Sequence, residues 1–82
     1  MNNQFVQKVV ELSSTFDAMP SAPYEKEWNE GEYSWLLRKR ILDDEFVEYY
    51  VARVSLTEKW RRDRAFATPS DDEGEWKIEV IS

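Results

Sequence analysis

The sequence predicts an α+β domain in which one N-terminal helix packs on an antiparallel meander sheet of four or five strands. Three observations support this prediction. Apolar residues recur at helical spacing near the N-terminus, an alternating pattern begins at Tyr24, and polar turn signals separate the alternating runs. With 82 residues, the chain has too little apolar surface for a second core, so residues 1–82 are expected to form a single domain.

The helix is expected over residues 3–18. Its apolar residues recur at spacings that keep them on one helical face, namely Phe5, Val9, Leu12 and Phe16. Asn2 or Asn3 is a suitable N-cap. Pro20 and Pro23 cannot continue a helix, so a linker is expected to begin there.

The strands are expected where apolar and polar residues alternate. The runs are Tyr24–Trp28, Tyr33–Leu42, Phe46–Leu56 and Glu75–Ile81. Turns are expected at Asn29-Glu30-Gly31, where Gly31 can take a positive φ, and at Asp43-Asp44, and a polar loop is expected over residues 69–74. In the last run, alternation predicts that Trp76, Ile78 and Val80 face inward.

Residues 57–68 fit two structures. As a strand, this segment places Phe66 on the same face as Trp60, Arg62 and Arg64. As a helix, it begins with a capping box of Ser55 and Glu58, which gives the alternative order α-β-β-α-β. The strand is preferred because it forms a local hairpin with the C-terminal run.

The composition argues against catalysis. The chain has no Cys and no His, which removes thiol chemistry, zinc-thiolate sites and the commonest general base. Only two glycines are present, and no glycine-rich phosphate loop can be recognised. We therefore expect a protein that is not an enzyme and has no catalytic residues, metal site or cofactor. No apolar run is long enough to span a bilayer, and no signal peptide is visible, so a cytoplasmic location is expected.

Charge is distributed unevenly along the chain. The net charge is −6, yet residues 33–68 carry eight basic against six acidic side chains. The basic residues form two clusters, Arg38-Lys39-Arg40 and Lys59/Arg61/Arg62/Arg64. These clusters are interpreted first as solvated strand faces with cross-strand ion pairs. The alternatives are a protein interface and a phosphate-binding patch with Trp35, Trp60 or a tyrosine as the stacking surface.

The acidic residues form two further clusters that are candidate partner-binding sites. They comprise Glu25, Glu27, Glu30 and Glu32, and then Asp71, Asp72, Glu73 and Glu75. Carboxylates two residues apart on a strand repeat at roughly 6.5–7 Å, close to the phosphate spacing of a nucleic-acid strand. The plainer interpretation is that these acids keep the protein soluble and protect an edge strand. Trp28, beside the first cluster, is either a half-buried core residue or an apolar anchor.

The functional prediction is a small acidic inhibitor or adaptor that docks on a basic groove of a larger, nucleic-acid-handling protein. In size, acidity and lack of catalytic groups the chain resembles phage-encoded counter-defence proteins, such as anti-CRISPR proteins and DNA-mimic inhibitors. No family motif carries this resemblance, so no residue role follows from it. Direct nucleic-acid binding through the basic clusters, and an immunity or assembly subunit, are the alternatives. A homodimer is also possible, through pairing of an exposed edge strand with a second copy.

Overall fold

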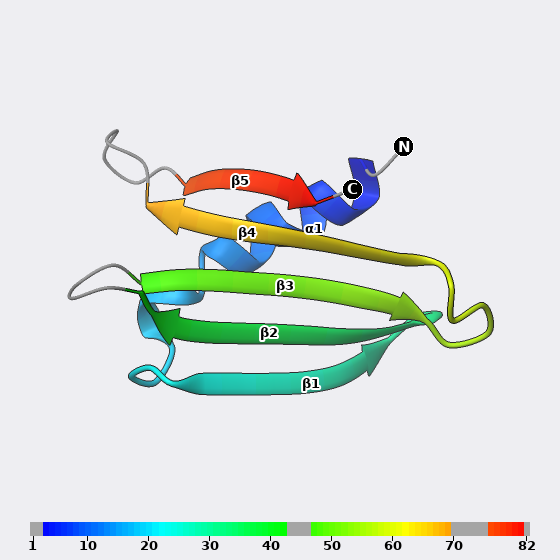
Figure 1. The fold of residues 1–82 in the computed structure, drawn as a ribbon, viewed down its shortest axis with the longest axis horizontal. Helices are drawn as coiled ribbons and strands as arrows, with labels where there is room; N and C mark the ends of the chain where they lie inside the picture. Colours follow the sequence, from blue (N-terminus) through cyan, green and yellow to red (C-terminus); the bar gives the residue numbers. More distant parts are fainter. Residues whose placement is uncertain (1–2, 43–46, 70–75, 82) are drawn as a thin grey trace.

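The computed structural model describes residues 3–42, 47–69 and 76–81. In this part of the chain, the helix α1 (Asn3–Ser13) and a 3₁₀ turn, η1 (Phe16–Ala18), precede five strands. The strands are β1 (Tyr24–Glu30), β2 (Tyr33–Ile41), β3 (Val47–Ser55), β4 (Arg62–Pro69) and β5 (Trp76–Ile81). They form one antiparallel sheet in the order β1-β2-β3-β4-β5, with α1 behind it (Figure 1). The predicted α+β meander is therefore confirmed.

The ambiguous segment is a strand, as preferred, but it begins later than predicted. β4 starts at Arg62, and residues 56–61 form the turn that connects it to β3. The β1–β2 turn lies at Gly31-Glu32, later than predicted, because Asn29 and Glu30 continue β1 and pair with β2. Gly31 has the predicted positive φ, +63°. The predicted turn at Asp43-Asp44, and residues 70–74 of the predicted polar loop, lie outside the described residues.

The helix is shorter than predicted because hydroxyl side chains end it. Three consecutive hydroxyls, those of Ser13, Ser14 and Thr15, donate to the carbonyl oxygens three residues earlier. The backbone tightens at the same point, since Thr15 N donates to Leu12 O at 2.9 Å. The chain then enters η1, which turns Phe16 into the core. The predicted helical face is otherwise correct, because Phe5 and Val9 are fully buried.

The core lies between α1 and one face of the sheet. Its buried residues are Phe5, Val9, Phe16, Trp35, Leu37, Tyr49, Val51, Ala65 and Ala67. Phe16 stacks on Tyr49 with ring centroids 4.0 Å apart, and the Tyr49 hydroxyl donates a hydrogen bond to Phe16 O at 3.0 Å. This contact fixes η1 on β3. Trp76 and Ile78 of β5 also pack on the core, as predicted.

Sequence reasoning missed one charged residue at the edge of this core. Arg53 of β3 lies on the α1 side of the sheet, and its Nε donates to Asp63 Oδ2 at 2.7 Å. Its guanidinium lies 4.2 Å from the Tyr33 ring centroid and 5.3 Å from that of Phe5. The ion pair and the aromatic rings together compensate for the loss of hydration. Arg53 therefore links α1 to the sheet.

The helix covers one face of the sheet only. α1 lies behind β4 and β5, and no described element packs on the opposite face (Figure 1). That opposite face is called the open face below. None of the described helices has the length and apolar character needed to cross a membrane.

Candidate binding surface on the open sheet face

Strand register determines which side chains point to the open face. The rows across the sheet are Asn29-Ser34-Val54-Arg62, Glu27-Leu36-Ala52-Arg64-Ile81 and Glu25-Arg38-Tyr50-Phe66-Glu79. Neighbouring rows carry the core residues and point toward α1. The open face is therefore a surface set by the strand register, and it combines apolar, aromatic and charged side chains.

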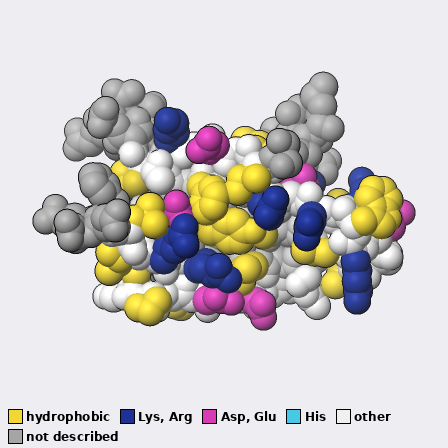
Figure 2. Space-filling model, in the orientation of Figure 1, with side chains coloured by type: hydrophobic (Ala, Val, Ile, Leu, Met, Phe, Trp, Pro, Cys, Tyr) yellow, Lys and Arg dark blue, Asp and Glu magenta, His cyan; other side chains and the backbone are white. Residues whose placement is uncertain are grey.

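The middle of the open face is apolar. Leu36, Tyr50, Val54 and Phe66 are all half-buried, and the rings of Tyr50 and Phe66 lie 5.2 Å apart at a tilt of 49°. Figure 2 shows hydrophobic side chains at the centre of this face, with basic side chains around them and acidic ones at the lower, β1 edge and near the upper edge. An aromatic and aliphatic centre of this kind is typical of the core of a protein interface.

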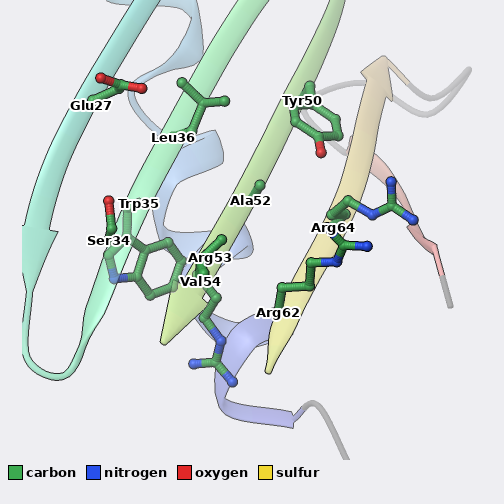
Figure 3. A pocket seen from close by; sticks show the side chains of 10 residues that line it. All are labelled: Glu27, Ser34, Trp35, Leu36, Tyr50, Ala52, Arg53, Val54, Arg62 and Arg64. Atoms are coloured by element: carbon green, nitrogen blue, oxygen red, sulfur yellow. The ribbon is translucent and has the colours of Figure 1, made fainter. Parts of the chain in front are cut away.

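A hollow of about 310 Å³ lies within this centre. Ala52 and Ser34 are short side chains between the larger Leu36, Tyr50 and Val54, so the surface is depressed there. Glu27 of β1 lies on one side of the hollow, and Arg62 and Arg64 of β4 lie on the other (Figure 3). The hollow therefore has an acidic and a basic side.

The first basic cluster is largely neutralised by its neighbours. Arg38 Nε contacts Glu25 Oε2 at 3.2 Å across the β1–β2 pair, and Arg40 Nε contacts Glu48 Oε1 at 2.7 Å across the β2–β3 pair. Lys39 points to the other face, where its Nζ donates to Pro20 O. The cross-strand pairing predicted from the sequence is confirmed for this cluster.

The second basic cluster is arranged differently. Neither Arg62 nor Arg64 forms an ion pair with a carboxylate of the described residues. In Figure 3 both side chains reach from β4 on the same side of the hollow. Arg61 pairs with Glu58 at 3.1 Å, and this contact raises the pKa of the Arg61 guanidinium. Arg62 and Arg64 are therefore available to a ligand, as is Lys77 of β5, and the two arginines are the ones that border the hollow.

The turn between β3 and β4 presents a large apolar side chain at one end of the molecule. Trp60 is 78% exposed and Leu56 is 47% exposed. The turn is well ordered by hydrogen bonds, because Ser55 Oγ accepts from the backbone N–H of Thr57 and Glu58. Leu56 N also donates to Glu32 O, which ties this turn to the β1–β2 turn. An exposed indole held by an ordered turn is a candidate anchor for a partner.

The structure divides the predicted acidic site. Glu25 and Glu27 are exposed on the open face, whereas Glu30 lies on the α1 side and contacts Lys8 Nζ at 2.8 Å. Glu32 is exposed in the β1–β2 turn. Asp71, Asp72, Glu73 and Glu75 lie outside the described residues. The first four acids therefore form no single row, because residues an odd number apart on a strand face opposite sides.

The predicted apolar anchor Trp28 belongs to the core side of the sheet. It is half-buried and stacks on Trp35 with ring centroids 6.0 Å apart. Its indole N–H donates to Glu30 at 3.3 Å. The bonds from Lys8 and Trp28 lower the pKa of the Glu30 carboxyl. The core interpretation of Trp28 is the one that the geometry favours.

The fold and the open face define a class of small α+β proteins with one uncovered sheet face. In the described ranges, no three acidic side chains are grouped closely enough to hold a metal ion. No protein-family model, curated protein or solved structure matches the chain.

Proposed function

We propose that this is a non-catalytic protein that acts by binding a larger protein through its open sheet face. The observation that supports this most strongly is the uncovered apolar centre with its hollow, bordered by charged side chains of both signs. Half-buried Tyr50, Phe66 and Leu36 offer apolar area, and Arg62 and Arg64 offer donors. Aromatic residues and arginine are the side chains most enriched at binding hot spots.

The mixture of charges favours a protein over a polyanion. A nucleic-acid backbone presents negative charge throughout, and it would meet Glu25, Glu27 and Glu48 on this same face. A protein surface can place a base against Glu27 and an acid against Arg62 and Arg64. Because the two signs lie on opposite sides of the hollow, they would also fix the orientation of the partner.

The partner class expected from the sequence fits one side of this surface. Glu25 and Glu27 are exposed at the β1 edge, where a basic groove of a nucleic-acid-handling protein could contact them. In this proposal the carboxylates steer association, and the apolar centre supplies most of the binding free energy. By covering the groove, the protein would act as an inhibitor or as an adaptor of its partner.

The proposal is tested by affinity capture of the tagged protein at low salt, with nuclease treatment and mass spectrometry of the bound proteins. Glu27→Lys on the open face is compared with Glu11→Lys on the exposed side of α1, because both make the same change in net charge. We expect the Glu11→Lys variant to retain the protein that the wild type captures. Glu27→Lys and Arg64→Glu should lose it, and retention by both of them would contradict the proposal.

A second candidate is single-stranded nucleic-acid binding along β4. One observation favours it, namely that Trp60, Arg62, Arg64 and Phe66 follow one another along this strand and its turn. Exposed aromatic rings and unpaired cations are the two components of such sites. Fluorescence polarisation with single-stranded and duplex oligonucleotides separates the candidates. Saturable binding that Arg62→Glu abolishes would replace the first proposal with the second.

A further inference from the structure

A second concave site lies on the α1 side of the sheet, away from the open face. α1 contacts β4 and β5, so it leaves the β1 half of that face incompletely covered. The chain between α1 and β1 borders the gap, which produces a groove of about 520 Å³. Clefts that hold small molecules have volumes of roughly 300–1,000 Å³.

The groove is lined mainly by apolar side chains from four segments. Buried Leu37 of β2 and half-buried Trp28 and Tyr24 of β1 line it on the sheet. Leu12 of α1 and Met19 of the linker line it from outside the sheet. An aromatic and aliphatic slot of this kind is suited to an extended or planar apolar group.

Three charged side chains lie along the groove, and they are not equivalent. Lys8 is occupied, because it forms the ion pair with Glu30 at 2.8 Å. Lys26 is exposed and lies 5.5 Å from the centroid of the Trp28 ring. It contacts no carboxylate of the described residues within ion-pair distance. The charge that the groove offers to a ligand is therefore positive, and it lies directly over the apolar wall.

We propose that this groove binds a small amphiphilic anion, with an apolar body against Trp28, Leu12 and Leu37 and its anionic group at Lys26. Lys26 supplies charge complementarity to a carboxylate or sulfonate, and the apolar slot excludes water from the body of the ligand. An amphiphilic cation would be repelled by Lys26. The site shares no residue that points to the open face, so it is independent of the proposed protein interface.

The test is a fluorescence titration of the protein with anilinonaphthalene sulfonate, followed by displacement with dodecanoate. Lys26→Glu is compared with Lys77→Glu on β5, since both reverse one exposed lysine. We expect Lys77→Glu to bind as the wild type does, and Lys26→Glu to weaken binding about fivefold. Ala18→Phe, which fills the groove from an exposed position, should weaken binding as well. Equal affinity in the wild type, Lys26→Glu and Ala18→Phe would overturn the proposal.

Amide chemical shifts of the wild-type protein give a second readout that depends on no variant. Dodecanoate should cause saturable shifts at Leu12, Lys26 and the Trp28 indole N–H, which now donates to Glu30. Saturable shifts at Leu36, Tyr50 and Phe66 would place the ligand on the open face and refute the groove. An absence of saturable shifts would refute it equally.

Discussion

At the scale of single residues, the Tyr49 hydroxyl is the clearest polar contact in the core. It donates to Phe16 O, and both residues are buried. Tyr49→Phe removes the donor and leaves the carbonyl without this partner, so we expect a loss of about 1–2 kcal/mol in the free energy of unfolding. Urea denaturation followed by tryptophan fluorescence measures it. Tyr50→Phe is the matched control, because that half-buried ring lies on the open face. An equal loss of stability in Tyr50→Phe would contradict a stabilising role of the hydrogen bond from Tyr49 to Phe16.

The Lys8–Glu30 contact gives a prediction on pH. The hydrogen bond from Lys8, followed by that from Trp28, lowers the pKa of Glu30. A carboxyl with a lowered folded-state pKa stabilises the fold above its unfolded pKa, and this contribution is lost as pH falls through the folded pKa. Lys8→Ala should therefore raise the pKa of Glu30 toward its ordinary value. An NMR titration of the Glu30 side chain checks this.

The control for that titration is Lys77→Ala, which removes a lysine on the open face. It should leave the midpoint of Glu30 unchanged. The stability difference between Lys8→Ala and the wild type should also be greatest near neutral pH and should shrink in acid. A midpoint unaffected by Lys8→Ala would show that the ion pair does not form in solution.

At the scale of elements, the docking of α1 depends on a narrow apolar stripe. Val9 is fully buried against the sheet, whereas its neighbour Val10 is 52% exposed. Val9→Ala should lower the free energy of unfolding by about 2 kcal/mol, because it leaves a cavity that the surroundings fill only in part. Val10→Ala should change it by less than about 0.5 kcal/mol. Similar losses in the two variants, measured by chemical denaturation, would mean that α1 docks through a different face.

The elements were predictable where one local signal dominated. The periodicity from Phe5 to Val9 determines a face that is confirmed, and the alternation in the last strand is confirmed for Trp76 and Ile78. Val80 shares that side of the sheet but is exposed, because it lies near the end of the edge strand. The helix end was misplaced because periodicity continues through Phe16, while the three hydroxyl residues before it compete for backbone carbonyls. Phe16 reaches the core from a 3₁₀ turn, and the spacing alone does not distinguish these two geometries.

The candidate site was less predictable than the elements, because it depends on pairing between strands. Glu25 and Glu27 could be assigned to one face from their spacing, but their partners could not. Only the register brings Glu25 to Arg38 and places Arg64 in the same row as Glu27. The hollow over Ala52 has no sequence signal of its own, since a lone alanine in a strand usually packs in a core. The apolar residues on both faces of β3 were the available signal for a surface there.

At the scale of the whole molecule, the net charge of −6 conceals an ordered separation of charge. On the open face, Glu25 and Glu27 lie on β1, and Arg62 and Arg64 lie on β4. Strand order places these two pairs of side chains, which are far apart in the sequence, on opposite sides of the hollow. In the proposed interface, this arrangement would fix the orientation of the partner in addition to the apolar contact.

The same separation predicts that the open face does not pair with itself. In aligned face-to-face packing about a two-fold axis parallel to the strands, β2 of one copy covers β4 of the other. Arg38 of one copy would then lie over Phe66 of the other, one row from Arg64 of that copy. With the axis perpendicular to the strands, β1 covers β1, and Glu25 and Glu27 would meet their own copies. Like charges come close to each other in both arrangements, and their repulsion is strongest at low ionic strength.

We therefore expect the protein to sediment as a monomer at low salt. Arg62→Glu combined with Arg64→Glu makes β4 complementary to β2 and should increase self-association in the same experiment, if the open face is accessible. The opposite result is a wild-type protein that dimerises at low salt and that Leu36→Asp converts to a monomer. It would show that a second copy covers the apolar centre. The heterologous partner proposed here would then have to compete with that copy for the same hollow.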